Sequence, residues 1–367
     1  MIRRLAVGLV LCVQCLAGSA QEWDSILGSV AAVGEPTPHW FTLRGRHIGY
    51  VIDGDAGEVK GTMTLSLFSP ALRAHLDKGL IYAYGSFYTR TYYGDRTDVV
   101  LMFDAQSMKP VGEVEIPPKA AGIGHSGMIG LVDDRFIGVW NITPAMSVSI
   151  VDAEQRTFVG EISTPGCAAI YPIGRGFLMP CGDGALQYVA LKADGTEASR
   201  TRSEVFFSVQ DDPVFDYAVP TAEGWLFMSL DGKVFEATWR DGGIVVSEPW
   251  SILSDDKDDE GWRIGGRQPF AYNAATGLLV TLMHQGGGQE TFEDDGTELW
   301  AFNVATQRRG YRLELEEEGS GVQLTEDARP LLLVSPGDGR TFRIHDGLTG
   351  RELRSMAELG GGLIQNL

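Results

Sequence analysis

Cysteine is the residue type whose placement first suggests chemistry in this chain of 367 residues. Two cysteines, Cys12 and Cys15, lie in the opening "MIRRLAVGLVLCVQCLAGSA", and the other two, Cys167 and Cys181, lie in "GCAAIYPIGRGFLMPCGDG". The later pair could form a disulfide, bind a metal or supply a catalytic thiol. Metal binding requires further ligands at suitable spacing and a catalytic thiol requires a local base, but none of the six His stands near the pair. The sequence therefore favours a structural disulfide between Cys167 and Cys181.

The remaining polar residues show no catalytic or metal-binding pattern. The chain has no G-x-S-x-G, H-E-x-x-H or P-loop motif, and its six His are scattered without metal-ligand spacing. We therefore predict that this chain contains no catalytic residue and no metal site.

Aromatic residues are concentrated in one stretch, "YAYGSFYTRTYY", which has six of them between Tyr82 and Tyr93. Such a stretch is explained either by a long, well-packed strand with its loop or by an aromatic wall beside a substrate path or a partner surface. Phe87 and Tyr88, at its centre, are the candidate residues of such a wall.

The first twenty residues have the pattern of a secretory signal peptide. Arg3 and Arg4 precede a mostly apolar run over 5–16, and the small residues of 18–20 precede Gln21, the expected mature start. The apolar run is shorter than the ~20 residues that cross a bilayer, so we expect no membrane span. Export to an oxidising compartment agrees with a disulfide.

The charge of the chain argues against nucleic acid as a partner. Its formal net charge is -19, and residues 1–20 carry two Arg and no acid, so removing them makes the chain more negative. Phosphate recognition requires a basic surface instead. With 44% hydrophobic and 10% aromatic residues, the chain can bury a large core.

Seven similar units must position these residues. Each unit is a β-rich run, a polar turn and a second run, as in "MFDAQSMKPVGEVEI" and "IVDAEQRTFVGEIST"; they cover 51–65, 102–116, 150–164, 190–204, 236–250, 301–315 and 343–357. A further strand precedes most of them, and an insertion with "HQGGGQETFEDDG" precedes the sixth. We predict an all-β, seven-bladed β-propeller over 37–367, preceded by an arm over 21–36. The C-terminal "GGLIQNL" is expected to pair with the first blade and close the ring.

Several of these stretches carry a resemblance to a known family. "GDRTDVVLMFDA", "EIPPKA", "CGDGALQYVALKADG", "FFSVQDDPVF", "EPWSILSDDKDDEGWRIGG" and "GTELWAFN" resemble the heavy subunit of tryptophan tryptophylquinone amine dehydrogenases. The resemblance covers roughly residues 45 to 355 and is closer to the aromatic amine branch than to the methylamine branch. The residues around Phe87 and Tyr88 differ from the family, as do the N-terminal region and the end of the chain.

The resemblance implies a division of labour between two chains. A separate, small, cysteine-rich light chain would carry the tryptophan tryptophylquinone cofactor, and this chain would carry none. Two heavy and two light chains would assemble in the periplasm and oxidatively deaminate primary amines. Electrons would pass to a blue-copper protein or a cytochrome, and Phe87 and Tyr88 would lie at the substrate channel. The cysteine pair falls where the family has its heavy-chain disulfide.

Two other functions stay open from the sequence. A propeller of this kind could act alone in the periplasm as a binding or scaffold protein, or it could be an enzyme with a site of its own. A co-purifying quinone chain would distinguish the first of these from an amine dehydrogenase subunit.

Overall fold

A computed structural model describes residues 32–68, 71–118, 125–254, 259–359 and 361–367. The predicted signal peptide, residues 1–20, and positions 21–31 of the predicted arm lie outside the described residues. Residues 33–367 form one compact unit. In the described residues its regular elements are strands and two short 3-10 helices, η1 (Leu76–Lys78) and η2 (Ser126–Met128), which confirms the all-β class.

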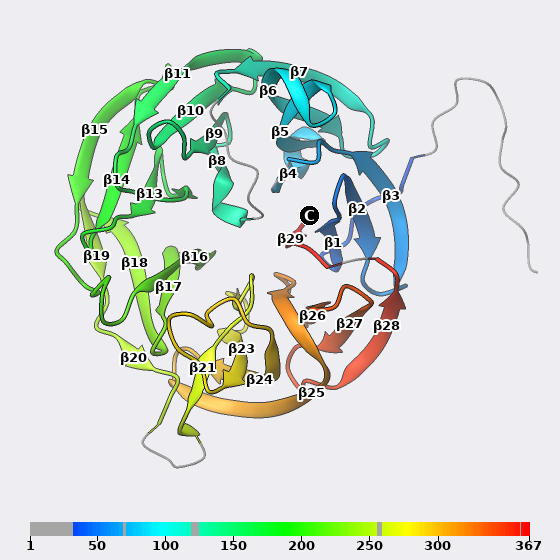
Figure 1. Cartoon of the computed structure of the whole chain (residues 1–367), viewed down its shortest axis with the longest axis vertical. Helices are drawn as coiled ribbons and strands as arrows, with labels where there is room; N and C mark the ends of the chain where they lie inside the picture. Colours follow the sequence, from blue (N-terminus) through cyan, green and yellow to red (C-terminus); the bar gives the residue numbers. More distant parts are fainter. Residues whose placement is uncertain (1–31, 69–70, 119–124, 255–258, 360) are drawn as a thin grey trace, which may run out of the picture. The chain divides into compact units, whose positions relative to one another are not determined.

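Five antiparallel sheets of four or five strands follow one another along the chain (Figure 1). The first has the order β29-β1-β2-β3, with β29 Ile364–Asn366, β1 Trp40–Arg44, β2 Ile48–Asp53 and β3 Glu58–Thr64. The second contains β4 Leu72–His75, β5 Leu80–Arg90, β6 Tyr93–Asp104 and β7 Pro110–Ile116. The third contains β8 Ile129–Val132, β9 Phe136–Asn141, β10 Ser147–Asp152 and β11 Thr157–Ser163. The fourth contains β12 Tyr171–Pro172, β13 Gly176–Pro180, β14 Leu186–Leu191 and β15 Glu197–Arg202. The fifth contains β16 Val214–Pro220, β17 Gly224–Ser229, β18 Lys233–Arg240 and β19 Gly243–Val246, with β20 Trp250–Ser251 also paired to β18.

The remaining strands form one sheet of eight. It contains β21 Trp262–Ile264, β22 Phe270–Asn273, β23 Leu278–Gln285, β24 Gly296–Asn303, β25 Arg308–Leu324, β26 Leu331–Pro336, β27 Thr341–Asp346 and β28 Glu352–Ala357. Its long strand β25 pairs with β24 along its first part and with β26 along its last part. The sequence predicted seven separate four-stranded units, whereas the described residues form six hydrogen-bonded sheets because β25 is continuous.

Apolar cores join each sheet to the next around a β-propeller arrangement. Tyr82 and Met102 of the second sheet share a core with Val139 of the third and Phe177 of the fourth. Other clusters join the first sheet to the second, the fourth to the fifth and the fifth to the eight-stranded sheet. The last cluster brings β26 and β27 against β1, where Phe41 and Phe342 stack with ring centroids 5.4 Å apart. The sheets therefore surround a common centre, as Figure 1 shows.

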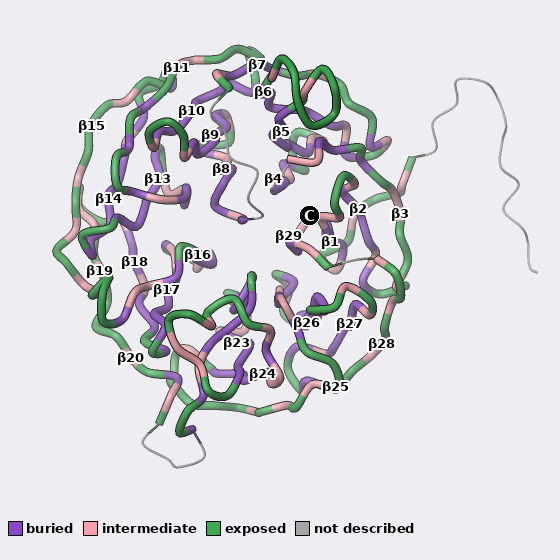
Figure 2. The backbone as a smooth tube through the Cα atoms, viewed as in Figure 1, coloured by how far each residue is buried: buried purple, intermediate pink, exposed green. Residues whose placement is uncertain are grey.

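The burial of each strand follows its place in its sheet. All six residues of β9 and all six of β10 are buried, because the neighbouring sheets cover both of their faces. Edge strands such as β3 and β11 are mostly exposed, and Figure 2 shows this exposure along the outer rim of the sheets. The seven hairpins predicted from the repeated units are all present.

A repeated side-chain contact explains the polar turns of these hairpins. Asp53 Oδ1 accepts the backbone N–H of Asp55 at 2.9 Å, and Asp152 Oδ1 accepts the N–H of Gln155 at 3.0 Å. The same contact recurs at Asp104, Asn303 and Asp346. Because Asp and Asn side chains bond backbone N–H groups two or three residues on, they stabilise tight turns without help from the rest of the fold.

The C-terminal strand β29 pairs antiparallel with β1, with Leu43 opposite Ile364, as predicted from "GGLIQNL". It is also tied to the sheets on either side. The Gln268 amide donates to Ile364 O and accepts from Ile364 N, both at 2.9 Å, and Gln365 Oε1 accepts the N–H of Leu72 at 2.7 Å. Side-chain bonds thus hold a strand only three residues long to both of its neighbours, and those from Gln268 pair with its backbone.

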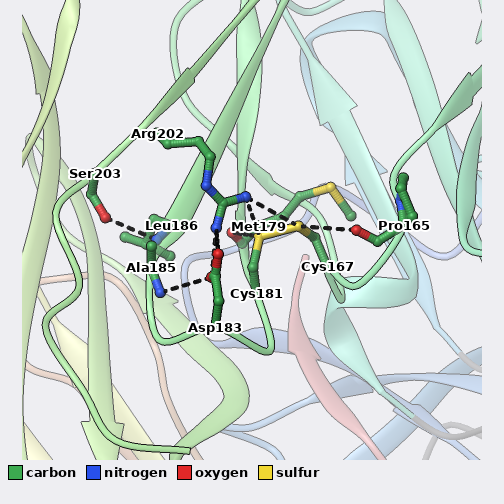
Figure 3. Close-up of a disulfide and its surroundings, with 9 residues drawn as sticks. All are labelled: Pro165, Cys167, Met179, Cys181, Asp183, Ala185, Leu186, Arg202 and Ser203. Atoms are coloured by element: carbon green, nitrogen blue, oxygen red, sulfur yellow. Dashed lines mark hydrogen bonds and ion pairs between the residues drawn. A yellow bond between two sulfur atoms is a disulfide. The ribbon is translucent and has the colours of Figure 1, made fainter.

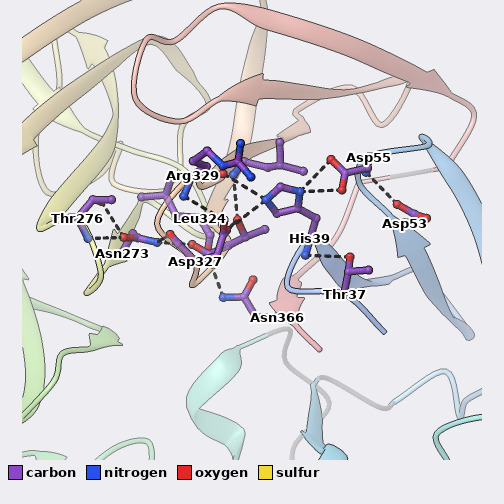
Figure 4. A network of polar contacts seen from close by, with 12 residues as sticks. Thr37, His39, Asp53, Asp55, Asn273, Thr276, Leu324, Asp327, Arg329 and Asn366 are labelled. Atoms are coloured by element: carbon purple, nitrogen blue, oxygen red, sulfur yellow. Dashed lines mark hydrogen bonds and ion pairs between the residues drawn. The ribbon is translucent and has the colours of Figure 1, made fainter. Parts of the chain in front are cut away.

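His39 directly precedes β1 and joins the first sheet to the last (Figure 4). Its Nδ1 lies 2.8 Å and 2.9 Å from the Asp55 carboxylate oxygens, and its Nε2 lies 3.2 Å from both Arg329 O and Asp327 Oδ1. Burial acts to lower the pKa of His39, but the two carboxylates outweigh it and the pKa is raised. We call His39, Asp55 and Asp327 the clasp.

Candidate functional site

The turns between the second and third strands of each sheet, and the turn between β26 and β27 of the eight-stranded sheet, all lie at one end of the strands, because the sheets share one antiparallel pattern. The connections from each outer strand to the next sheet reach the same end. We call this end the pocket face and define it by the turns 45–47, 91–92, 142–146, 181–185, 230–232, 286–295 and 337–340. The clasp lies at the opposite end, where His39 directly precedes β1 and its two partners lie in the turns 54–57 and 325–330.

The β5–β6 hairpin projects from the pocket face. These strands have 11 and 12 residues, against six each in β9 and β10. Five extra residues extend a hairpin by about 15 Å. Residues 81–86 and 98–103 are buried, whereas none of 87–97 is. The tip bears Tyr92 and Tyr93, which are 61% and 63% exposed.

A buried ion pair fixes the base of this hairpin. The carboxylate of Asp98, fully buried, accepts two bonds from Arg96, at 2.7 Å and 2.8 Å. Arg96 also donates to Ser86 Oγ at 3.1 Å. Bidentate geometry of this kind holds both side chains in one orientation, so the projecting residues are carried on a rigid base.

The structure places Phe87 and Tyr88, the predicted channel residues, on this projecting part. Phe87 is 42% exposed, so it does not belong to a packed core. Tyr88 is half-buried, with its ring 5.5 Å from that of Phe68 in an edge-to-face arrangement. The aromatic stretch therefore divides: Tyr82 and Tyr84 are core residues, while its later members lie toward solvent.

Cys167 and Cys181 form a disulfide on the pocket face, as predicted (Figure 3). Cys167 lies in the connection from β11 to β12, and Cys181 directly follows β13. Arg202 Nη1 lies 3.4 Å from Cys181 Sγ, while its Nη2 lies 2.5 Å from Asp183 Oδ1. The bond thus fixes the connection between the third and fourth sheets where it enters the pocket face.

A pocket of about 1250 Å³ opens on the pocket face beside the eight-stranded sheet. Aromatic residues form part of its wall, with Phe215 and Phe292 at a ring separation of 6.5 Å. Two guanidinium groups, of Arg44 and Arg267, also line it. They are outnumbered by the six carboxylates of Asp216, Glu293, Asp294, Asp295, Glu318 and Asp338.

His125 and Asp216 form a polar contact in the wall of the pocket. His125 Nδ1 accepts the N–H of Gly127 at 3.0 Å, so a neutral ring carries its proton on Nε2, which lies 3.3 Å from Asp216 Oδ1. Burial acts to raise the pKa of Asp216, but this contact outweighs it and lowers the pKa. Asp216 therefore contributes a negative charge to the pocket.

His284 lies in the same wall, only 6% exposed, and its Nε2 is buried without a hydrogen-bond partner among the described residues. Its ring is confined between two glycines, since a Cβ at Gly265 or Gly287 would collide with it. A Cβ at Gly337 would likewise collide with the carboxylate of Asp295. Glycine at these positions thus keeps both polar groups at the pocket.

Sequence reasoning missed this pocket. Its carboxylates come from separate segments of the chain, between Asp216 in β16 and Asp338 in the turn after β26, and the one available signal was the insertion "HQGGGQETFEDDG", which supplies His284 and Asp294. Across the described ranges, no three His, Cys, Asp or Glu side chains are grouped as metal ligands. No helix there has the length and apolar character that crossing a membrane requires.

Fold and site together define a β-propeller protein with an acidic pocket and a projecting aromatic hairpin at one end. A family described as "Methylamine dehydrogenase heavy chain (MADH)" matches residues 36–365. The methylamine dehydrogenase heavy chain of Paracoccus versutus is 30% identical over 320 residues, which cover 85% of this chain and 74% of that one. That of Methylobacillus flagellatus is 27% identical over 316 residues, covering 85% and 78%. The chain belongs to the methylamine dehydrogenase heavy-chain family.

The fold is also found in more distant proteins. The β-propeller domain of Cps50 (Swd1) from Myceliophteria thermophila superposes with a TM-score of 0.55 at 11% identity, covering 82% of this chain and 91% of that domain. Identity this low supports the fold alone.

Proposed function

We propose that this chain is the heavy subunit of an amine dehydrogenase that holds a separate quinone-bearing light chain. The observation that carries the proposal is the family match over residues 36–365. The light chain is expected to be small and cysteine-rich, to carry tryptophan tryptophylquinone, and to assemble as two heavy and two light chains. The chemistry is oxidative deamination of a primary amine, with a blue-copper protein or a cytochrome as electron acceptor.

The pocket face supports a docking role. Its loops carry six of the large apolar side chains that are exposed in the described residues, which are Phe87, Tyr92, Tyr93, Val205, Val209 and Phe292. Exposed apolar residues gathered at one end of a protein mark an interaction surface. Aromatic residues are also enriched where partners bind tightly. We propose that the light chain lies on this face, with the β5–β6 hairpin along its side.

We propose further that the substrate is an aromatic or aralkyl amine, and that Phe87 and Tyr88 line its path. Phe87 is exposed on a rigid hairpin, which suits contact with a substrate ring better than packing does. Aromatic pairs contribute ~0.5–1.5 kcal/mol beyond the area they bury.

The finer points of architecture and location are part of the same proposal. We infer that the eight-stranded sheet represents two blades sharing β25, so that the ring has seven blades closed by β29. We also propose that residues 1–20 direct the chain to the periplasm and are then removed.

Purification of the tagged chain from its native cells tests the assignment. A small cysteine-rich chain should co-purify, with a visible quinone band that bleaches when a primary amine is added. The chain expressed alone should show neither the band nor amine turnover. A chain that purifies without a partner from amine-grown cells would favour a stand-alone propeller instead.

Paired variants test the docking face. Tyr92→Ser with Tyr93→Ser should reduce recovery of the light chain. Phe158→Ser is the matched control, because Phe158 is 38% exposed on the outer strand β11, away from the pocket face. Equal recovery with both variants would contradict docking at the hairpin.

A further inference from the structure

The pocket beside the eight-stranded sheet has unbalanced negative charge. Among the described residues, Glu293, Asp294, Asp295 and Glu318 form no ion pair, while Asp338 lies 3.4 Å from Arg340. Among the described residues that line this concave surface, two carry a guanidinium, Arg44 and Arg267. A cleft lined mainly by one sign of charge concentrates ligands of the opposite sign.

A second observation is a polar atom in the wall of the pocket that has no partner among the described residues. His284 is 6% exposed, and its Nε2 has no partner among the described residues. Buried polar atoms are almost always hydrogen-bonded, so an unpartnered one in a pocket wall calls for a ligand or an ordered water. In the tautomer with its proton on Nδ1, Nε2 accepts a hydrogen bond, as an ammonium group requires of its partners.

The same pocket offers an apolar surface beside the charge. Phe292 is 43% exposed at the rim, and Phe215 lies below it with a ring separation of 6.5 Å. A ligand with a cationic head and an apolar tail would contact both kinds of surface. Aromatic rings also attract cations directly.

We propose that this pocket binds a free primary ammonium ion bearing an alkyl or aryl group. The carboxylates of Asp294 and Asp295 bind the ammonium, and Phe292 contacts the apolar group. Such a site would collect substrate on the heavy chain before it reaches the light chain, and in that respect the proposal rests on the proposed function. An inorganic metal ion is a poorer ligand, because the described residues contain no group of three metal-ligating side chains.

Calorimetric titration of the full chain tests the site without the light chain. The probe is 2-phenylethylammonium, and 2-phenylethanol is the neutral control of similar shape. We expect the ammonium to bind at least tenfold more tightly, with affinity falling as salt is added. Equal affinity for the two compounds, or no binding of either, would overturn the proposal.

Variants then locate the binding. Asp294→Asn with Asp295→Asn should weaken ammonium binding at least tenfold, and His284→Gln should weaken it by a smaller factor. Glu113→Gln is the control, because Glu113 is exposed on the outer strand β7, away from the pocket. Asp294 is exposed and Asp295 half-buried, so the double variant should melt like the wild type. Unchanged affinity in the folded double variant would place the ligand elsewhere.

Binding measurements on the assembled complex distinguish a free amine from a lysine of the partner chain, since both carry a primary ammonium group. If the site serves free amine, the ammonium should still bind to the complex, measured with the quinone blocked. Binding to the lone chain that disappears in the complex would mean that a lysine of the partner occupies the pocket, and would overturn the free-amine proposal. Because the titration uses the lone chain, its outcome does not depend on whether a quinone partner is found.

Discussion

Replacing His39 with Gln should make the stability of the propeller less dependent on pH. Both ring nitrogens of His39 lie against oxygen atoms, so the protonated ring satisfies them best. Its folded-state pKa is raised above the usual 6.5, while the unfolded chain has no clasp. The clasp therefore stabilises the fold fully below pH 6.5, and this contribution is lost as the pH rises through the raised pKa.

The solvent exposure of Asp55 and Asp327 determines how much stability the His39 substitution removes. Asp55 is 59% exposed, so its pair with His39 contributes no more than ~0.5 kcal/mol. Asp327 is 24% exposed, and a charge-assisted bond there contributes about 1 kcal/mol. The substitution should thus reduce the free energy of unfolding by about 1.5 kcal/mol at pH 6, or a melting temperature by about 3 °C in a chain of this size.

Thermal melts of wild type and His39→Gln at pH 6 and pH 9 check this expectation. The difference between the two proteins should be largest at pH 6 and should nearly vanish at pH 9. His47→Gln is the control, since His47 is exposed and its imidazole makes no ion pair in the described residues. A difference that stays constant, or that grows with pH, would refute the charged clasp.

Three further predictions follow from the described contacts and the sequence. Cys167→Ser with Cys181→Ser should reduce the free energy of unfolding by about 3 kcal/mol, the value for a closed loop near 15 residues, as measured by chemical denaturation; a change below 1 kcal/mol would contradict the expected stabilisation. Phe87→Ala should change the preference between aromatic and small amines, measured as the ratio of their kcat/KM values, by a factor equivalent to about 1–3 kcal/mol. Because Phe87 is exposed, its stability cost should stay well below the ~3–5 kcal/mol of a buried Phe, and an unstable variant with unchanged selectivity would contradict the assignment. Intact-mass measurement of the exported protein should begin at Gln21 or its cyclised form, and a mass that retains residues 1–20 would exclude cleavage there.

The hairpins could be predicted from the sequence because their determinants are local. An Asp or Asn at the end of a strand bonds the turn that follows it, as at Asp53, Asp152 and Asp346, and the flanking strands have a clear apolar pattern. The pairing of the C-terminal strand was also accessible, since one unit lacked a strand and "GGLIQNL" had no unit of its own. The continuous strand β25 was not, because the Gly and Ser residues of 319–321 read as a break in the sequence, whereas in the structure they stay within the strand and only shift its pairing register.

The acidic pocket could not be predicted in the same way. Apart from the run 293–295, its carboxylates are single residues of strands β16 and β25 and of the turn 337–340, which the fold brings together without any regular spacing in the sequence. The clasp has the same origin, since His39 and Asp327 are 288 positions apart and meet because the last sheet packs against the first. Of the contacts between distant residues at the pocket face, the disulfide could be predicted from the sequence. Cys167 and Cys181 are the two cysteines that remain once the opening segment is set aside, so each has one possible partner.

The two ends of the strands differ in how much variation they allow. At the clasp end the hairpin turns are two to six residues long, and at least five of them are fixed by an Asp or Asn side chain. At the pocket face the turn 286–295 has ten residues and the β5–β6 hairpin projects beyond its neighbours. Loops there can change length and composition without disturbing the turns that hold the ring, since the cores lie between the sheets. Differences in amine or partner preference among relatives should therefore be found in the pocket-face loops, and exchange of the 286–295 turn between two relatives should transfer preference while leaving the melting temperature nearly unchanged.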